Sequence, residues 1–310
     1  MADQMNLNQV RIVDPILTTI AQGYADPEFV GGALFPAVPV MLSGGQIIEF
    51  DKSSFQRYNT SRAPGTPFKR MELGYLGRPY ALLNKGLEAV VPRENQRDAS
   101  VMPGIDLAKI KLNGVMSILR RELEIEQATL ATDPSRYDSN HKIALSGTSK
   151  FSDPSSDPIA AIDSWKENIR ATTGMYPNTI IFSAVAWKAF RNNPAVKARI
   201  QYTQKAVVTI ELAASLLEIP NVKVGTALVA DSSGNFSDVW GNNIVMAYTA
   251  LGSLDSAVPS YGYTYTMQGH PAVEQPYWSN ESKGWVYGVA FERAAVLSGI
   301  TSGFLIQTPA

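Results

Sequence analysis

The sequence predicts an α+β fold in which a long helix lies on a β-sheet and a smaller α/β unit is inserted into the chain between them. Three patterns predict this fold. Apolar residues recur at helical spacing over residues 103–131, short helices alternate with short apolar strands over 155–250, and strand-like alternation dominates 251–310. The core is therefore expected to combine residues that are far apart in the sequence.

The helix expected over 103–131 is the element around which the other segments are arranged. Its apolar stripe recurs every three or four residues and consists of Ile105, Ala108, Leu112, Val115, Leu119 and Leu123, widened by Ile118 and Ile125. Glu124 is expected to fall mostly away from this stripe. Asp133–Pro134 ends the helix, because a residue before proline avoids the α region. At about 1.5 Å per residue the helix is roughly 35–40 Å long, so it needs a broad sheet to lie on.

The composition limits the classes to which the protein can belong. The 310 residues carry a formal net charge of −1, which disfavours a basic surface that coats nucleic acid. The absence of cysteine excludes thiolate metal sites, disulfides and cysteine nucleophiles. The chain opens on a polar segment and has no apolar run long enough to span a bilayer, so we expect a soluble, cytoplasmically made protein with no membrane association.

Charge is unevenly distributed along the chain. Residues 1–45 carry net −3, residues 46–92 net +3, residues 159–205 net +5 and residues 206–310 net −5. Blocks of opposite sign can meet within one subunit or between subunits, and such complementarity mainly determines partner and register.

Residues 1–45 have little periodicity. Asp14–Pro15 can start a short helix, and a segment rich in glycine, proline and bulky apolar residues follows at 29–40. This segment is too broken to make a core of its own. It can lie along the surface of another subunit, or it can be an ordinary N-terminal extension on its own domain.

Residues 46–92 predict an extended β-hairpin. Strands are expected at 46–50, 68–75 and 82–91, and the turn-rich segment 59–67 separates the first two. Basic residues cluster near its tip: Arg57, Arg62, Lys69 and Arg70. A hairpin alone is marginally stable in water, so it should rest on another surface. It would be a lid in a monomeric enzyme and a contact with the next subunit in an assembly.

The sequence after the long helix predicts the α/β unit, followed by a β-rich C-terminal segment. A strand is expected at 141–146, Asp157–Pro158 starts a helix, and Ser183 caps the next helix after a strand at 178–182. A further helix is expected at 209–218. Further strands are expected at 222–224, 227–230 and 244–248, and aromatic strands at 261–268 and 283–293.

No catalytic motif is present, so neither an enzyme nor a cofactor is predicted. His141 and His270 are isolated and are expected to be structural. Glu122 and Glu126 lie one helical turn apart and could share a metal, but relief of their repulsion by basic neighbours is the favoured interpretation, so no metal is predicted. A basic stretch contains Lys188, Arg191, Lys197, Arg199 and Lys205 with Tyr202 among them. Nucleic-acid contact is conceivable there, but helix-face solvation or a subunit contact is favoured.

The order of these parts resembles the major capsid proteins of tailed bacteriophages, which have the Hong-Kong-97-type fold. The segments VDPILTTIAQGYADPEFVGGALFPAVPV and DPIAAIDSWKENIRATTGMYPNTIIFSAVAWKAF look like segments of such shell proteins. The resemblance implies an N-terminal arm at 1–45, an extended loop at 46–85, a peripheral domain at 86–154 and 251–310 with the spine helix at 103–131, and an axial domain at 155–250.

The function implied by this resemblance is that of a structural shell subunit. Copies would assemble as hexamers and pentamers into an icosahedral capsid that encloses packaged DNA without sequence-specific binding. The implied partners are a separate scaffolding protein, expected because no long helical scaffolding segment precedes the arm, a portal and decoration proteins. The protein would be found in the virion and assembled in the host cytoplasm.

Candidate contact residues between subunits follow from the charged loop and the apolar arm. They are Asp14, Asp26, Glu28, Phe29, Leu34, Phe35, Arg57, Arg62, Lys69 and Arg70. Burial of the apolar members between subunits would supply most of the affinity. Two alternatives remain open: an encapsulin-type nanocompartment shell, and a monomeric hydrolase or binding protein whose hairpin is a lid.

Overall fold

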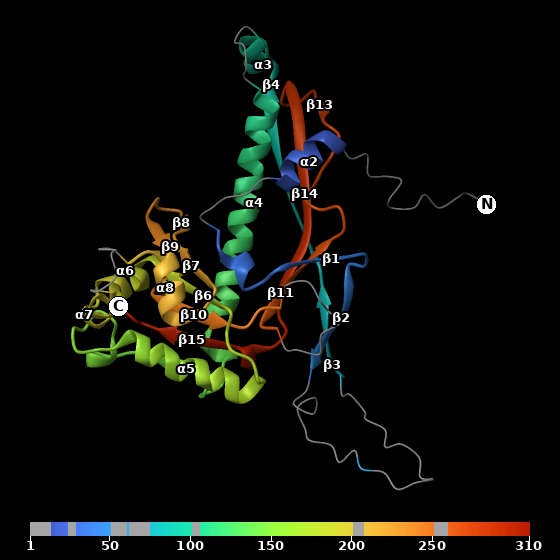
Figure 1. Cartoon of the computed structure of the whole chain (residues 1–310). Helices are drawn as coiled ribbons and strands as arrows, with labels where there is room; N and C mark the ends of the chain where they lie inside the picture. Colours follow the sequence, from blue (N-terminus) through green and yellow to red (C-terminus); the bar gives the residue numbers. More distant parts are fainter. Residues whose placement is uncertain are drawn as a thin grey trace.

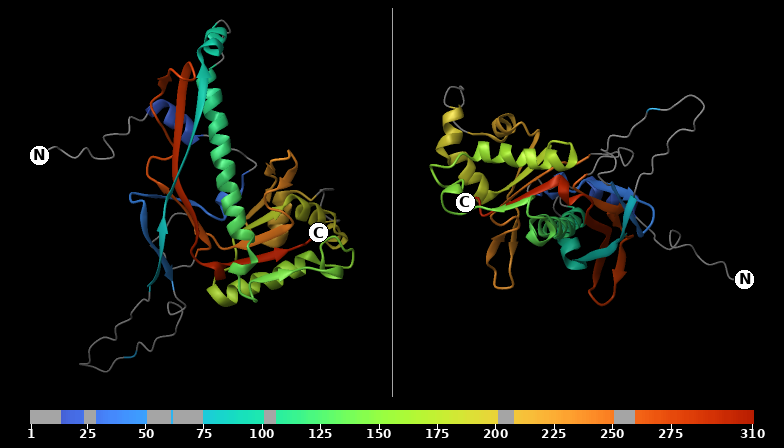
Figure 2. Two further views of the ribbon diagram at one scale, coloured as in Figure 1. Left: turned by 180° about the vertical axis from the view of Figure 1, so that it is seen from behind. Right: turned by 90° about the horizontal axis from the view of Figure 1, so that it is seen from below.

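Two β-sheets and one long helix that contacts both define the architecture (Figure 1). The computed structural model describes residues 14–23, 29–50, 61, 75–100, 106–200, 208–250 and 260–310. The first sheet lies along the N-terminal part of the helix, and the second lies at its C-terminal end (Figure 2). The molecule is therefore elongated along the helix axis, with a second unit at one end.

The long helix α4 spans Leu107–Thr132, with Asp106 as its N-cap, whose side chain accepts a 3.1 Å hydrogen bond from the Lys109 N–H. It ends at Asp133, immediately before Pro134, as predicted. The predicted stripe is confirmed in its central part, since Leu112, Val115 and Leu119 are buried. Ile118 is 53% exposed, so its assignment to the stripe was wrong.

The first sheet has six strands in the order β1 (Ala37–Val40), β11 (Gly262–Met267), β14 (Gly284–Leu297) and β12 (Ala272–Val273). Strands β4 (Leu83–Pro92) and β13 (Tyr277–Ser279) also pair with β14. Helix α2 (Pro15–Gly23) packs on β12 and α4. Valine and phenylalanine side chains of β12 and β14 meet the apolar stripe of α4 in one core cluster. The expectation of a broad sheet beneath the helix is therefore confirmed.

The second sheet has five strands in the order β5 (Lys142–Ala144), β15 (Gly303–Gln307), β10 (Asn243–Ala247), β6 (Thr179–Ser183) and β7 (Asn221–Gly225). Residues 142–144 and 303–307, which the resemblance places in the peripheral domain, pair in this second sheet and not in the sheet beside the long helix. After β14 the chain turns through η5 (Ile300–Ser302), and the buried strand β15 then pairs antiparallel with β10.

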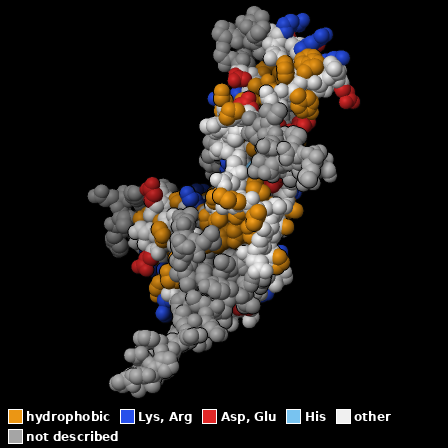
Figure 3. Space-filling model, turned by 90° about the vertical axis from the view of Figure 1, so that its right-hand side faces the viewer, with side chains coloured by type: hydrophobic (Ala, Val, Ile, Leu, Met, Phe, Trp, Pro, Cys, Tyr) orange, Lys and Arg blue, Asp and Glu red, His pale blue; other side chains and the backbone are white. Residues whose placement is uncertain are grey.

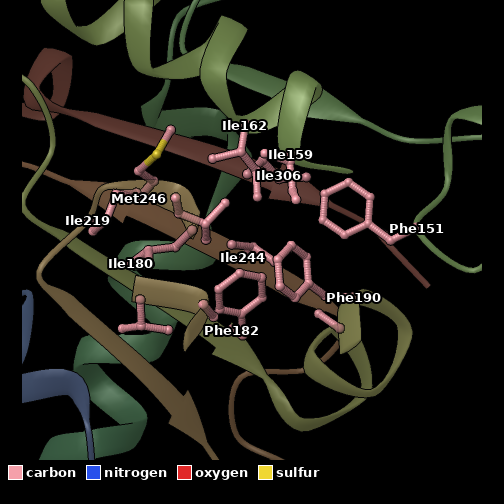
Figure 4. Packing of buried hydrophobic residues seen from close by; sticks show 14 of the residues in the cluster. Phe151, Ile159, Ile162, Ile180, Phe182, Phe190, Ile219, Ile244, Met246 and Ile306 are labelled. Carbon is pink, nitrogen blue, oxygen red and sulfur yellow. The ribbon is translucent and has the colours of Figure 1, made fainter. Parts of the chain in front are cut away.

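Four helices cover one face of the second sheet: α5 (Pro158–Thr173), α6 (Ala184–Asn192), α7 (Pro194–Ile200) and α8 (Ile210–Leu217). Isoleucine and phenylalanine side chains from these helices interdigitate with those of β6, β10 and β15 (Figure 4). The opposite face packs on the C-terminal end of α4 and the segment around Phe35. The α/β unit is thus one layer of helices on a sheet.

Local signals in the sequence explain where these helices begin and end. Asp157 accepts hydrogen bonds from Ile159 N–H and Ala160 N–H at the start of α5, and Gly174 ends it in the left-handed conformation. Ser183 caps α6 as predicted. The helices α7 and α3 (Arg93–Ser100) were not predicted, because each is too short to show a periodic pattern.

Two separate hairpins complete the fold. Strands β2 (Gly44–Phe50) and β3 (Tyr75–Ala81) pair antiparallel, which confirms a hairpin in this region. Most of the strand expected at 68–75, and the segment 59–67 apart from Ser61, lie outside the described residues. The second hairpin joins β8 (Leu228–Ala230) and β9 (Phe236–Asp238). Single-turn 3-10 helices η1 (Gly31–Ala33), η3 (Pro134–Arg136) and η4 (Gly147–Ser149) connect other elements.

Two tyrosines are buried where the two sheets meet. The hydroxyl groups of Tyr137 and Tyr261 lie 2.5 Å apart, and the Tyr137 hydroxyl lies 2.7 Å from the Ala131 carbonyl oxygen at the end of α4. Burial raises the pKa of the Tyr137 hydroxyl well above its usual value, and burial likewise raises the pKa of Tyr261. The folded protein therefore holds both protons at a pH where the unfolded chain releases them.

We predict that this tyrosine pair makes the protein sensitive to alkali. The unfolded tyrosines ionise near pH 10, so above that pH the unfolded state binds fewer protons than the native state. The free energy of unfolding then falls by up to about 1.4 kcal/mol per pH unit for each tyrosine. Urea denaturation between pH 8 and pH 11 measures this slope. Tyr137→Phe combined with Tyr261→Phe should make the slope shallower, whereas the control Tyr263→Phe should not. An unchanged slope in the double variant would contradict this assignment.

Candidate assembly surfaces

The described part of the chain offers no candidate metal site. It contains no group of three or more histidine, aspartate or glutamate side chains that could hold a metal ion. Within these residues no helix combines the length and apolarity needed to cross a bilayer. The His141 ring is buried between Asp138 Oδ1 at 2.7 Å and Thr172 Oγ1 at 3.0 Å, which is a structural role. Surfaces for contact with other chains are therefore the candidate functional sites.

The two carboxylates considered for a metal are instead paired with bases. Arg293, whose side chain has no exposed surface, lies 2.8 Å from Glu126 and 3.5 Å from Glu122. Lys85 lies 2.8 Å from Glu122 and 3.6 Å from Glu126. The hydrogen bond that Lys85 donates to Glu122 raises the pKa of Lys85, while burial lowers the pKa of Arg293 against the attraction of both carboxylates. This cluster attaches α4 to β14 and β4, and it confirms the favoured interpretation.

A third carboxylate, Glu124, anchors the arm and was missed at the sequence level. It is 2% exposed and accepts hydrogen bonds from Val30 N–H at 3.0 Å, Gly31 N–H at 2.8 Å and the Trp240 indole N–H at 2.8 Å. A buried carboxylate needs such donors, because removal from water is otherwise costly. Glu124 therefore joins the arm, α4 and the loop after β9. No helical pattern could reveal this, since its partners lie far away in the sequence.

The arm segment 29–40 completes the core of its own subunit. Leu34 and Phe35 are 0% and 1% exposed within a single chain, so the expectation that they become buried between subunits was wrong. The Phe35 ring fits only because Gly262 has no side chain, since a Cβ there would lie 2.6 Å from the ring. Strand β1 continues the arm by pairing parallel with β11. Of the two interpretations of the arm, the structure supports an extension on its own domain for these residues.

The remaining candidates differ in what the structure says of them. The carboxylate of Asp14 caps α2 by accepting hydrogen bonds from Ile16 N–H and Leu17 N–H, both at 2.9 Å. Phe29 is partly exposed and stays a candidate contact. The others lie outside the described residues: Asp26, Glu28, Arg57, Arg62, Lys69 and Arg70.

Exposed apolar side chains gather at the base of the β2–β3 hairpin. An open groove of about 1150 Å³ lies there between α2, the ends of β1 and β11, and the start of β4. Met41 lines this groove, and Met41, Leu42 and Leu83, on the two chain segments that meet there, are each more than half exposed. Single exposed apolar residues are ordinary, but several at one place mark a surface that another chain can cover.

A second exposed surface lies at the far end of the first sheet. The rings of Trp278 on β13 and Trp285 on β14 meet edge to face, with their centroids 5.9 Å apart, and both are more than one third exposed. Tyr277 is 48% exposed beside them. Figure 3 shows hydrophobic side chains at this upper end of the molecule, next to basic ones. Aromatic residues with a basic rim are typical of protein–protein contacts.

Comparison with known proteins defines the class to which this arrangement belongs. The family model described as "Phage major capsid protein E" matches residues 136–286. The curated major capsid protein of Burkholderia phage BcepMu is 37% identical over 272 residues, which cover 86% of this chain and 88% of that protein. The chain belongs to the phage major capsid protein family, whose members are structural and not enzymatic.

Solved structures agree with this assignment. A phage-related protein from Bordetella bronchiseptica RB50 is 42% identical, with a TM-score of 0.83 over 97% of this chain and 98% of that chain. A chain of the satellite phage P4 procapsid matches with a TM-score of 0.53 at 10% identity, over 99% of this chain and 92% of that chain, which shows a shared fold alone. The protein has the Hong-Kong-97-type fold and is a subunit of an icosahedral phage capsid shell.

We predict that one methyl group added at Gly31 disturbs the contact between Glu124 and the arm and destabilises the protein. A Cβ at Gly31 would press on Gln127 Oε1 and lie 2.9 Å from Glu124 Oε2, whereas a Cβ at Gly32 meets nothing within 4 Å. Gly31→Ala should therefore lower the free energy of unfolding by about 1–3 kcal/mol, and Gly32→Ala should leave it within about 0.5 kcal/mol. Chemical denaturation of the two matched variants measures the difference. Equal stability of the two would contradict the role of Glu124.

Proposed function

We propose that this shell subunit assembles as hexamers and pentamers around packaged DNA, which it encloses without sequence-specific binding. The observation that carries the proposal is the 37% identity to a major capsid protein over most of both chains. The formal net charge of −1 supports the second part, because a wall around confined DNA should not bind that DNA tightly.

The parts of the chain then take distinct roles in the shell. Residues 1–45 serve as the N-terminal arm and 46–85 as the extended loop. The peripheral domain is built on α4 and the six-stranded sheet, and the axial domain on the five-stranded sheet with its covering helices. The separation into two sheets, which share α4 and the segment around Phe35, supports this division.

The extended loop is proposed to lie on an adjoining subunit. Residues 46–92 carry net +3, and the opposite charge occurs in residues 1–45 and 206–310. Rim ion pairs of this kind are worth only about 0–1 kcal/mol each, so they set register, while apolar contacts supply most of the affinity. The exposed side chains at the base of the β2–β3 hairpin support a covered surface there.

Further partners follow from membership in this family. A separate scaffolding protein, a portal and decoration proteins are proposed to act with the shell, which forms in the host cytoplasm before it becomes the capsid of the virion. The structure of the P4 procapsid includes a size-determination protein, which supports auxiliary proteins in assemblies of this fold.

The comparisons do not favour either alternative function. The relative whose sequence identity of 37% shows the family is a phage major capsid protein. Neither a nanocompartment shell nor a monomeric hydrolase or binding protein is therefore supported. The test is direct. Purified particles from cells that express the chain with its partner proteins should appear as closed shells in negative-stain electron microscopy, and a stable monomer at all concentrations would contradict the proposal.

We predict that the basic loop residues act in assembly and not in folding. Replacing Arg57, Arg62, Lys69 and Arg70 with alanine should leave the melting temperature within a few degrees of the parent but reduce particle yield about tenfold or more, because several inter-subunit charge contacts are lost together. Circular dichroism and sucrose-gradient sedimentation measure the two effects. A control that replaces the exposed Lys109 and Lys111 of α4 should reduce yield less. Normal yield from the quadruple variant would contradict the loop assignment.

A further inference from the structure

Four cations of the basic stretch noted in the sequence lie on α6 and α7, while Tyr202 and Lys205 lie outside the described residues. Lys188 and Arg191 are exposed on α6, and Lys197 is exposed on α7. Arg199 is engaged with Asp157 at 2.9 Å, but the other three cations have no acidic partner in the part of the chain that the structure describes. Val185 lies one helical turn before Lys188 and is 41% exposed. We call these four residues, Val185, Lys188, Arg191 and Lys197, the α6–α7 surface.

The β8–β9 hairpin has the complementary character. In its register Leu228 lies opposite Asp238 and Ala230 lies opposite Phe236, so these four side chains share one face. Phe236 is 74% exposed and Leu228 is 45% exposed. Residues 226–243 contain Asp231 and Asp238 and no basic residue. An isolated two-stranded hairpin is marginally stable in water, so an apolar face of this kind indicates a covering partner.

These two surfaces lie on opposite sides of the same unit. Helices α6 and α7 belong to the layer that covers one face of the five-stranded sheet. The loop that follows β9 carries Trp240 into the core on the other face. In the view from below, the β8–β9 hairpin projects on the side of the sheet opposite α5 (Figure 2). The hairpin of one subunit therefore cannot cover the α6–α7 surface of that same subunit.

We propose that the β8–β9 hairpin of one copy binds the α6–α7 surface of the next copy in a contact that repeats head to tail around a ring. Asp238 would face the unpaired bases of α6 and α7, and Phe236 would cover the apolar spot at Val185. The same surface cannot pair with itself, because that would set like charges against each other. A contact between two different surfaces closes into a ring when its rotation permits. The inference rests on the proposed shell function and names the partner surfaces within it.

Nucleic acid fits the α6–α7 surface less well than a second copy of the chain does. It would leave Phe236 and Leu228 uncovered, whereas a second copy of this chain covers the apolar residues and neutralises the charges of both surfaces at once. The charge complementarity between two surfaces of one chain therefore favours contact between copies.

The absence of cysteine from the chain permits a clean test. A variant with Val185→Cys and Phe236→Cys, assembled into particles and treated with a short bismaleimide, should give a ladder of covalent oligomers on a denaturing gel. Each single variant should give monomer alone. The control pairs Phe236→Cys with Ile110→Cys, because Ile110 is exposed on α4, far from the α6–α7 surface, and it should give no ladder.

Charge reversal provides a second readout. Lys188→Glu with Arg191→Glu should lower particle yield about tenfold, and the addition of Asp238→Lys should recover most of that loss. Intact particles that give no ladder, or a charge reversal that Asp238→Lys does not rescue, would overturn the head-to-tail contact. A parent chain that forms no particles would instead overturn the shell function on which the contact rests.

Discussion

The buried carboxylate of Glu124 is the constraint on which the arrangement of the two sheets depends. Because this carboxylate is buried away from water, its hydrogen bonds must come from donors of the protein itself. Two donors come from the backbone of the arm and one comes from the indole of Trp240. These segments are separated by about two thirds of the chain, and both must be in place before the helix can be buried. The contact therefore makes arm, helix and second sheet fold as one unit.

The carboxylates on the neighbouring turns of α4 extend this constraint to the first sheet. Successive residues of an α-helix are about 100° apart around its axis, so Glu122 and Glu126 lie nearly opposite Glu124. Glu122 and Glu126 contact Lys85 and Arg293 on the six-stranded sheet, while Glu124 contacts the arm and Trp240. Residues 122–126 of α4 are thus held by contacts on two opposite sides of the helix. Rotation of the helix would break both sets of contacts, and this determines how the two sheets are oriented.

The sequence predicted elements whose signals are local. Asp157–Pro158, Ser183 and Asp133–Pro134 determine helix ends through contacts within a few residues, and all three were confirmed. Strand pairing depends on distant partners, which explains why the sequence did not predict that β5 and β15 pair with each other and why the short strand β12 was missed. Leu34 and Phe35 were correctly recognised as apolar residues that need a cover, but Gly262 and Tyr261, which provide it, lie more than two hundred residues away.

The candidate contact surfaces cannot be predicted from the sequence in the way that the core can. Periodicity predicts which residues face inward, but it cannot distinguish a solvated face from one that another chain covers, so Phe236, Trp278 and Trp285 carried no signal of contact in the sequence. Their exposure becomes informative only once the contacts within the subunit are known. Because internal contacts determine the orientation of the sheets, contacts between copies need only be individually weak and complementary. Weak contacts repeated many times select register and remain reversible while a shell closes, whereas a few very strong contacts would trap misplaced copies.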